Sequence, residues 1–429
     1  MKQLLRADIM TGDTSVIKNG YIGIDGDTID YIGQNKPTAD YDTKRELKDR
    51  LLIPGLFNAH THSSMVLFRG FGGGLPLERW LLEKIFPVEN KLICADISVG
   101  TRLVMMEMLA GGTVSFTDMY MEPHTAADEI ERAGMKANIT RPLLAFDKTE
   151  PYDKNFRVRE SIELYNSRHN TAGGRIKVDF GIHAEYTNYD EVVRRYGEAC
   201  KEHGAIMHLH LSETRKEHKE CKERNGGKTP AQWFADLGVF DNPTVAAHCV
   251  AVESEDIDIL LAKDVTIVHN PTSNMKLGSG FMPLSKMINC GVKLALGTDG
   301  ASSNNNVNMF EEMHLASVIH CGYNGDPTLV SPVKLLQMAT VGGAMAQERE
   351  DCGILAVGNK ADIVALDMSR PHLMPVLDYP GLLTYSAQAG DVAMTMVDGR
   401  ILYENGEYLT IDAERVRHDL PEAIERLLG

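Results

Sequence analysis

Near residue 60 the chain reads Leu52-Ile53-Pro54-Gly55-Leu56-Phe57-Asn58-Ala59-His60-Thr61-His62, a short apolar run that ends in two histidines. Seven further apolar runs follow it, and stretches with helical spacing, such as 97–110 and 189–203, lie between most of them. Eight strands that alternate with helices predict an α/β fold, a (β/α)8 TIM-type barrel. The predicted strands are 52–59, 113–119, 136–144, 177–183, 205–211, 244–249, 265–269 and 292–296.

A doubly wound open sheet is the structural alternative, because it also alternates strands with helices. Dinucleotide-binding sheets of that kind carry Gly-x-Gly-x-x-Gly directly after a strand, and this sequence has no such fingerprint. The glycine-rich stretch Gly70-Phe71-Gly72-Gly73-Gly74 has a different spacing. We therefore favour the barrel and expect residues 70–74 to form a flexible loop, and a hinge, above it.

Both ends of the chain are richer in strand patterns than the middle. Near the N-terminus Asp25-Gly26-Asp27 joins two alternating segments, and Asp-Gly in that position is typical of a tight hairpin. A similar pattern runs from residue 361 to residue 403. We expect a small composite β-sandwich domain formed by both chain ends. The predicted domains are 1–54 with 359–429, which includes a C-terminal helix, and the barrel 55–358.

Composition narrows the class of protein. The net charge of −16 argues against a nucleic-acid partner, which would require a basic surface. No run approaches the ~18 apolar residues of a membrane span, and the N-terminus is too polar for a signal peptide. Seven cysteines without a Cys-x-x-Cys pair suit free thiols in a reducing compartment. We expect a cytoplasmic enzyme; a homo-oligomer is compatible with the sequence.

Polar residues interrupt the predicted strands where each one ends, which is the catalytic face of such a barrel. His60 and His62 are two residues apart on the first strand, so their side chains point the same way. His208 and His210 on the fifth strand share a face by the same rule, and either satisfies the geometry of a ligand. With Asp299 after the eighth strand, these histidines predict a catalytic site for zinc or ferrous iron.

The number of metal ions also follows from the strand ends. A second metal would require a bridging ligand, commonly a modified lysine at the end of the fourth strand. That strand ends Phe180-Gly181-Ile182-His183, without a lysine. One divalent metal is therefore expected.

These motifs resemble the amidohydrolase superfamily, in particular its 5-methylthioadenosine/S-adenosylhomocysteine deaminase branch with chlorohydrolase and cytosine-deaminase-like relatives. The resemblance covers nearly the whole chain and includes the expected barrel with its composite β-sandwich. It is carried by Pro54–His62, His208-Leu209-His210-Leu211-Ser212-Glu213-Thr214, His248-Cys249, His269-Asn270-Pro271-Thr272-Ser273-Asn274-Met275-Lys276-Leu277 and Gly297–Asn305.

The resemblance implies specific roles at the metal. It makes His60, His62, His210 and Asp299 the ligands of one ion, with zinc favoured and ferrous iron as the alternative, and the metal would lower the pKa of a bound water. Asp299 would also accept the proton of that water. Glu213 would protonate a ring nitrogen of the substrate and pass a proton to the departing ammonia.

The resemblance also implies that His248 holds or polarises the attacking water. The alternative is a buried histidine that bonds only to its neighbours. For Glu213 the alternative is an exposed carboxylate at the start of a helix. His269 ends a strand as well, and it either bonds the loop that follows or contacts substrate.

Further residues match the adenosyl-type deaminases as substrate contacts. Trp80 would pack on the nucleoside and Glu89 would accept hydrogen bonds from the ribose hydroxyls. Arg141 and Arg157 would meet the carboxylate of a homocysteine tail, although Arg159 is close enough to replace Arg157. Core packing of the tryptophan and surface ion pairs of the arginines are the alternatives. The remaining expected contacts are His183, at a purine nitrogen, Glu213 and Ser303.

We therefore expect a hydrolytic deaminase that converts the 6-amino group of an adenosine derivative to a keto group. The candidate substrates are S-adenosylhomocysteine, 5-methylthioadenosine, 5′-deoxyadenosine and adenosine. An alternative is deamination or dechlorination of another heterocycle, such as guanine, a pterin, cytosine or an s-triazine, at the same site. A remote alternative is a non-catalytic binding protein derived from such a barrel, which would lack some of the ligands.

Overall fold

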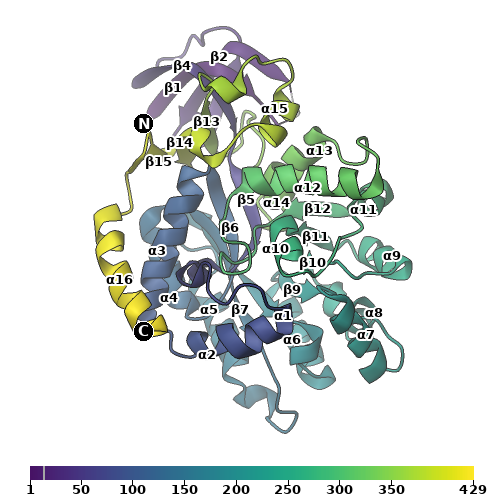
Figure 1. The fold of residues 1–429 in the computed structure, drawn as a ribbon. Coiled ribbons are helices and arrows are strands. Elements are labelled where there is room, and N and C mark those ends of the chain that lie inside the picture. Colours follow the sequence, from purple (N-terminus) through teal and green to yellow (C-terminus); the bar gives the residue numbers. More distant parts are fainter. Residues whose placement is uncertain (13–14) are drawn as a thin grey trace.

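The computed structural model describes residues 1–12 and 15–429, and it contains two sheets (Figure 1). The first is an eight-stranded parallel sheet with the strands in sequence order, which confirms the predicted barrel. Its strands are β5 (Leu56–Thr61), β6 (Thr113–Met119), β7 (Lys136–Leu143), β8 (Ile176–Ile182), β9 (Met207–Leu211), β10 (Thr244–His248), β11 (Thr266–His269) and β12 (Lys293–Leu296).

The segment after β12 returns to β5 and closes the barrel. The backbone N–H of Asp299 donates to the carbonyl of His60 at 3.0 Å, and that of Thr298 donates to Asn58 Oδ1 at 3.1 Å. Two predicted metal ligands are therefore neighbours across the closure.

Helices cover the outside of the barrel (Figure 1). Their amphipathic pattern is clear in α6, where Val192, Val193, Tyr196 and Cys200 are buried along one face. The longer helices are α3 (Cys94–Ala110), α4 (Pro123–Ala133), α5 (Phe156–Arg168), α6 (Asp190–His203), α7 (Arg215–Arg224), α9 (Ser254–Ala262) and α12 (Met309–Asn324). The shorter ones are α1 (Leu77–Trp80), α2 (Phe86–Glu89), α8 (Pro230–Asp236), α10 (Pro271–Lys276), α11 (Leu284–Cys290), α13 (Pro332–Gln337), α14 (Gly343–Ala346) and α15 (Tyr379–Tyr385).

The first predicted strand, 52–59, needs one correction. Residues 52–54 end strand β4 of the other sheet, and the first barrel strand begins only at Leu56. Gly55 lies between the two strands, where a Cβ atom would come within 2.4 Å of the Val114 side chain. Apolar residues continue through this junction because both sheets are buried here, so hydrophobicity alone does not mark the boundary.

The second sheet is mixed and combines both ends of the chain, as predicted. Strand β2 pairs with β3 through the predicted tight turn, and β13 pairs with β4. Its order is β16 (Glu407–Tyr408), β15 (Arg400–Glu404), β14 (Val392–Val397), β13 (Ile363–Asp367), β4 (Thr43–Pro54), β1 (Lys2–Met10), β2 (Val16–Asp25) and β3 (Thr28–Gly33).

The last helix, α16 (Ala413–Leu428), lies along α3 of the barrel (Figure 1). Arg102 of α3 pairs with Asp419 of α16 at 3.3 Å. The division into 1–54 with 359–429 and 55–358 stays a prediction.

Across residues 1–12 and 15–429, no helix combines the length and the hydrophobicity needed to cross a membrane.

Candidate active site

Four polar side chains converge above the carboxyl ends of β5, β9 and β12. His62 Nε2 lies 3.1 Å from Asp299 Oδ1 and 3.3 Å from His210 Nε2, and His60 Nε2 lies 3.6 Å from the same carboxylate oxygen. Nε2 of His60 is buried, yet it has no hydrogen-bond partner among the described residues. Imidazole nitrogens and a carboxylate that face one point are a donor set suited to zinc or ferrous iron. The ligand atoms of His60, His62 and Asp299 lie within 4.8 Å of one another, and His210 joins this group through its contact with His62.

The outward nitrogen of two of these rings is fixed by a backbone carbonyl. His62 Nδ1 donates to the carbonyl of Met119 at 2.6 Å, and His210 Nδ1 donates to that of His183 at 2.7 Å. A carbonyl oxygen can only accept, so each Nδ1 carries a proton, and in the neutral, metal-binding form of each ring Nε2 turns its lone pair toward the centre.

His208 occupies a different place from His210. Its Nε2 atom lies 2.8 Å from His60 Nδ1, and the two rings stack with centroids 5.1 Å apart. The His208 ring is fully buried behind His60. This geometry favours His210 as the ligand on β9, because His208 already uses its Nε2 in holding His60.

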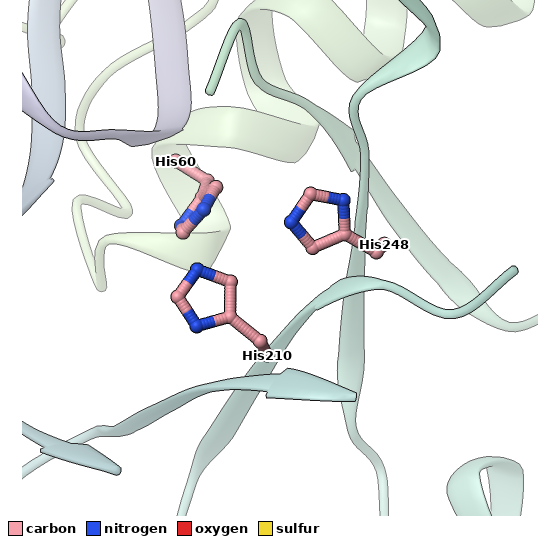
Figure 2. A group of neighbouring side chains, drawn as sticks. All are labelled: His60, His210 and His248. Carbon is pink, nitrogen blue, oxygen red and sulfur yellow. The ribbon is translucent and has the colours of Figure 1, made fainter. Parts of the chain in front are cut away.

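His248, the last residue of β10, adds a fifth group to this cluster. One ring nitrogen from each of His60, His210 and His248 lies within 4.8 Å of the others, and Figure 2 shows the three rings around a common space. His248 Nδ1 donates to Asn274 Oδ1 at 2.8 Å. Its Nε2 atom is 3.9 Å from Glu213 Oε2, which brings two of the predicted catalytic residues together.

The two oxygens of Asp299 have different neighbours. Oδ1 faces His60 and His62, while Oδ2 accepts hydrogen bonds from the hydroxyls of Ser273 at 2.6 Å and Ser303 at 2.8 Å. Burial opposes ionisation of this carboxyl, but its interactions with the nearby imidazoles of His60 and His62 outweigh it and hold the pKa of Asp299 well below its usual range. The carboxylate is therefore ionised and oriented by its surroundings.

Glu213 lies after β9 and is buried rather than exposed at a helix start. Burial raises the pKa of its carboxyl above the ordinary value. Its backbone N–H donates to Glu217 Oε2 at 2.7 Å, so the peptide that carries the side chain is held from α7. A raised pKa favours the protonated form that a proton donor requires.

These groups line a small chamber that adjoins a larger cavity. The chamber, of about 50 Å³, is bounded by Glu213, His248, Asp299 and Ser303 together with Trp80. The neighbouring cavity of about 400 Å³ shares His62 and His183 with it. The larger cavity is also lined by Glu89, Arg141, Arg157, Tyr120, Phe86, Phe146 and Leu82.

Glu89 is buried at the end of α2 in the larger cavity. The hydroxyl of Tyr120 donates to Glu89 Oε1 at 2.7 Å. Burial raises the pKa of Glu89. Trp80 is also buried. It lines the small chamber, as a substrate contact would, and it also packs in the hydrophobic core.

The three arginines in question have different surroundings. Arg141 Nε donates to Glu160 Oε2 at 2.6 Å. Arg157 lies above the Phe156 ring, and its buried Nε atom lacks a hydrogen-bond partner in the described part of the chain. Arg159 is exposed and lines neither the chamber nor the cavity. Arg157 is thus the better placed of the two arginines on α5.

His183 borders both spaces at the end of β8. Burial lowers the pKa of its ring to about 3, so the imidazole is neutral and can hydrogen-bond a purine nitrogen. His269, for which two roles were possible, instead bonds through Nε2 to His320 Nε2 at 3.0 Å. His320 lies on α12 and is buried, although its sequence context gave no sign of a role.

Sequence reasoning missed several residues behind the site. Ser273 and Asn274 belong to a motif that was recognised without a function, and they contact Asp299 and His248. Tyr120 had no signal, because it reaches the site from the end of β6, whose position depends on the packed barrel. Glu217 had one, because Thr214 and Glu217 form the Thr-x-x-Glu pattern of a capping box at the start of α7.

Comparisons with known proteins show which family the chain belongs to. A model of the family described as "Amidohydrolase family" matches residues 51–402. A 5-methylthioadenosine/S-adenosylhomocysteine deaminase of Thermoanaerobacter pseudethanolicus is 41% identical over 420 residues, which cover 98% of this chain and 97% of that protein. A 5′-deoxyadenosine deaminase of Methanosarcina acetivorans is 39% identical over 421 residues, covering 98% of this chain and 96% of the other.

Solved structures of similar proteins have the same fold. An adenosine deaminase from Xanthomonas campestris with bound zinc superposes with a TM-score of 0.93 at 28% identity, covering 99% of this chain and 98% of that one. A triazine hydrolase variant reaches a TM-score of 0.92 at 21% identity over 99% of both chains, which supports the fold alone. The matches confirm the predicted superfamily and hydrolytic deaminase class, and the chain belongs to the amidohydrolase family.

Proposed function

We propose that this protein is a metal-dependent deaminase of 5′-modified adenosines, with S-adenosylhomocysteine, 5-methylthioadenosine and 5′-deoxyadenosine as the candidate substrates and adenosine as a fourth. One observation carries the proposal. A chamber that contains a metal-type donor set and two buried proton-transfer groups opens onto a cavity with a buried carboxylate and an unpaired guanidinium nitrogen. The relatives named as deaminases of such nucleosides support the same substrate class.

His60, His62, His210 and Asp299 would hold one divalent ion, zinc or ferrous iron, which lowers the pKa of a water and polarises it when bound. The unpartnered Nε2 atom of His60 supports this assignment, because a buried imidazole nitrogen without a partner is costly. The zinc in the adenosine deaminase neighbour makes zinc the favoured ion.

The residues then divide the proton transfers of the reaction. Water adds to C6 of the adenine ring, and Asp299 Oδ1 accepts the proton that the water loses. Glu213 donates its proton to the adjacent ring nitrogen, while His248 Nε2 holds the water from the other side. Glu213, now unprotonated, takes the second proton of the added water from the C6 hydroxyl and passes it to the amino group. The C6–N bond then breaks, ammonia and the keto product leave, and the proton left on Asp299 is exchanged through solvent so that Glu213 is protonated again. Each well-placed proton transfer accelerates the step about 10²–10⁴-fold.

The larger cavity would bind the rest of the nucleoside. Glu89 would accept hydrogen bonds from the ribose hydroxyls through Oε2, since Tyr120 already uses Oε1. His183 would meet a purine nitrogen and Trp80 would pack on the ring. Arg157, and Arg141 from beside Glu160, would attract a carboxylate at the 5′ end. An ion pair between a guanidinium and this carboxylate would discriminate between substrates with and without an acidic tail.

The test is a deamination assay that follows ammonia release from the purified protein after its metal content has been measured. It compares the four adenosine derivatives with guanine and cytosine, for the wild type, Glu89→Ala and Glu83→Ala. Glu83 is an exposed carboxylate of the same helical segment and serves as the control.

We expect turnover of the 5′-modified adenosines that falls sharply in Glu89→Ala and is retained in Glu83→Ala. Turnover restricted to free bases, by a protein that contains its metal, would contradict the nucleoside assignment. A protein without bound metal that still deaminates would contradict the role of the four ligands.

A further inference from the structure

Helix α10 (Pro271–Lys276) touches two of the proposed catalytic groups with two consecutive side chains. Ser273 Oγ donates to Asp299 Oδ2 at 2.6 Å, and Asn274 Oδ1 accepts from His248 Nδ1 at 2.8 Å. Both side chains are fully buried, and neither lines the chamber or the cavity. They therefore lie behind the reacting groups, out of reach of a substrate.

The Asn274 contact determines where His248 carries its proton. An amide oxygen only accepts, so the Nδ1 atom of His248 must be the donor. In the neutral ring Nε2 is then left with a lone pair, and it faces Glu213 and the centre of the site. The opposite tautomer would place a proton on Nε2 and would require the amide to turn, so that Nδ2, which has no partner among the described residues, donates to Nδ1.

The Ser273 contact acts on the other side of the centre. Asp299 has one oxygen near the imidazoles and one that accepts from the hydroxyls of Ser273 and Ser303. With Oδ2 held in this way the carboxylate cannot rotate, and Oδ1 stays directed toward His60 and His62. Orienting partners of this kind commonly affect activity or metal affinity about 10–100-fold.

The backbone gives an independent reason for such support. Both His248, with φ of 74°, and Asp299, with φ of 60°, adopt left-handed conformations that side chains other than glycine rarely take. Each such residue costs of order 1–3 kcal/mol and persists only when its surroundings hold it. Helix α10 contacts both of these residues, because Ser273 binds Asp299 and Asn274 binds His248.

We propose that Ser273 and Asn274 are positioning residues of the reaction: Asn274 selects the Nδ1-protonated tautomer of His248, and Ser273 fixes the orientation of Asp299. This inference rests on the proposed deaminase function for its kinetic consequence. The tautomer itself is a property of the protein without substrate and can be measured separately.

The test uses the metal-loaded full-length protein and four variants. Asn274→Leu removes the acceptor at similar volume, Asn274→Asp retains an oxygen acceptor, and Ser273→Ala removes the donor. Met275→Leu is the control, because Met275 lies on the same helix without lining the site. The measurements are kcat and KM, metal content, and the ¹⁵N shifts of the His248 ring, assigned by comparison with His248→Gln.

We expect Asn274→Leu and Ser273→Ala to lower kcat about 10–100-fold with KM nearly unchanged, since neither residue touches the cavity. Asn274→Asp should recover most of the loss. In the wild type His248 should show a protonated Nδ1 and an unprotonated Nε2, and Asn274→Leu should shift this balance. Met275→Leu should match the wild type in every measurement.

Several outcomes would overturn the inference. A wild-type His248 protonated at Nε2, or an Asn274→Leu variant with an unchanged tautomer and unchanged kcat, would refute the role of Asn274. Full kcat in Ser273→Ala would refute the role of Ser273. If no adenosine derivative is turned over by the wild type, the proposed function fails, while the ¹⁵N shifts still decide the tautomer.

Discussion

Arg157→Met tests whether the larger cavity selects substrates with an acidic tail. Arg157 lines this cavity from α5, and burial together with the charge of Arg141 lowers the pKa of its guanidinium, which remains charged because arginine titrates far above neutrality. Its buried Nε atom has no partner in the described chain. A hydrogen bond to a charged group contributes about 1.5–3 kcal/mol, which corresponds to roughly 10–150-fold in kcat/KM.

The assay compares two substrates that differ at the 5′ end. S-adenosylhomocysteine carries a carboxylate beyond its thioether, and 5-methylthioadenosine carries only a methyl group. We expect kcat/KM of Arg157→Met to fall by the factor above for the first substrate and by less than about threefold for the second. Arg157→Lys should lie between, because an ammonium keeps the charge but loses the planar fork of donors.

Arg159→Met is the matched control, since Arg159 is exposed two residues further along the same helix. It should behave as the wild type toward both substrates. Equal losses for the two substrates in Arg157→Met would show that the guanidinium does not recognise the tail. A selective loss in Arg159→Met would assign the tail to Arg159 and refute the placement of the tail at Arg157.

Three further predictions address the metal, the proton donor and the contact between the two sheets. His210→Asn should abolish metal binding, measured by elemental analysis. His208→Asn should weaken metal binding about 10–100-fold, because His208 only holds His60. Equal metal content in the two variants would contradict this ligand assignment. Glu213→Gln should lower kcat about 10²–10⁴-fold with the metal retained, because it keeps the shape but loses the proton, and an unchanged kcat would exclude it as the donor. Lys136→Met should lower the free energy of unfolding, measured in urea, by about 3–5 kcal/mol, because Asp362 and Asp398 lose their buried counterion. The control Lys44→Met, at an exposed position, should leave the free energy of unfolding nearly unchanged. Equal stability of the two variants would contradict this prediction.

The barrel was predictable because its strands are short, buried and separated by amphipathic helices. Parallel strands covered on both faces appear as continuous apolar runs, and all eight runs correspond to observed strands. Polar residues at the ends of such runs stand out, which is why the amino-acid sequence by itself groups His60, His62 and Asp299 with either His208 or His210. The error at 52–54 arose where two buried sheets meet without a polar residue between them.

The partners of these residues were not predictable in the same way. His208 and His210 are equivalent in spacing. The resemblance favoured His210, and in the structure the packing of His208 against His60 distinguishes the two. Tyr120 reaches Glu89 from the end of β6, across 31 residues of sequence. Such contacts depend on how distant elements pack, and alternation along one strand contains no information about them.

The alternation of side chains along a strand does not predict the direction of the His248 and Asp299 side chains, because both residues have left-handed backbone conformations. Alternation predicts the direction of a side chain while the backbone is extended. His248 is the last residue of β10 and Asp299 lies three residues beyond the end of β12, and both have positive φ angles, so the backbone is not extended at either residue. A barrel with relaxed strand ends would direct these two groups elsewhere. The strained conformation therefore belongs to the catalytic geometry, and its cost is offset by contacts from outside the strands, among them those of Ser273 and Asn274.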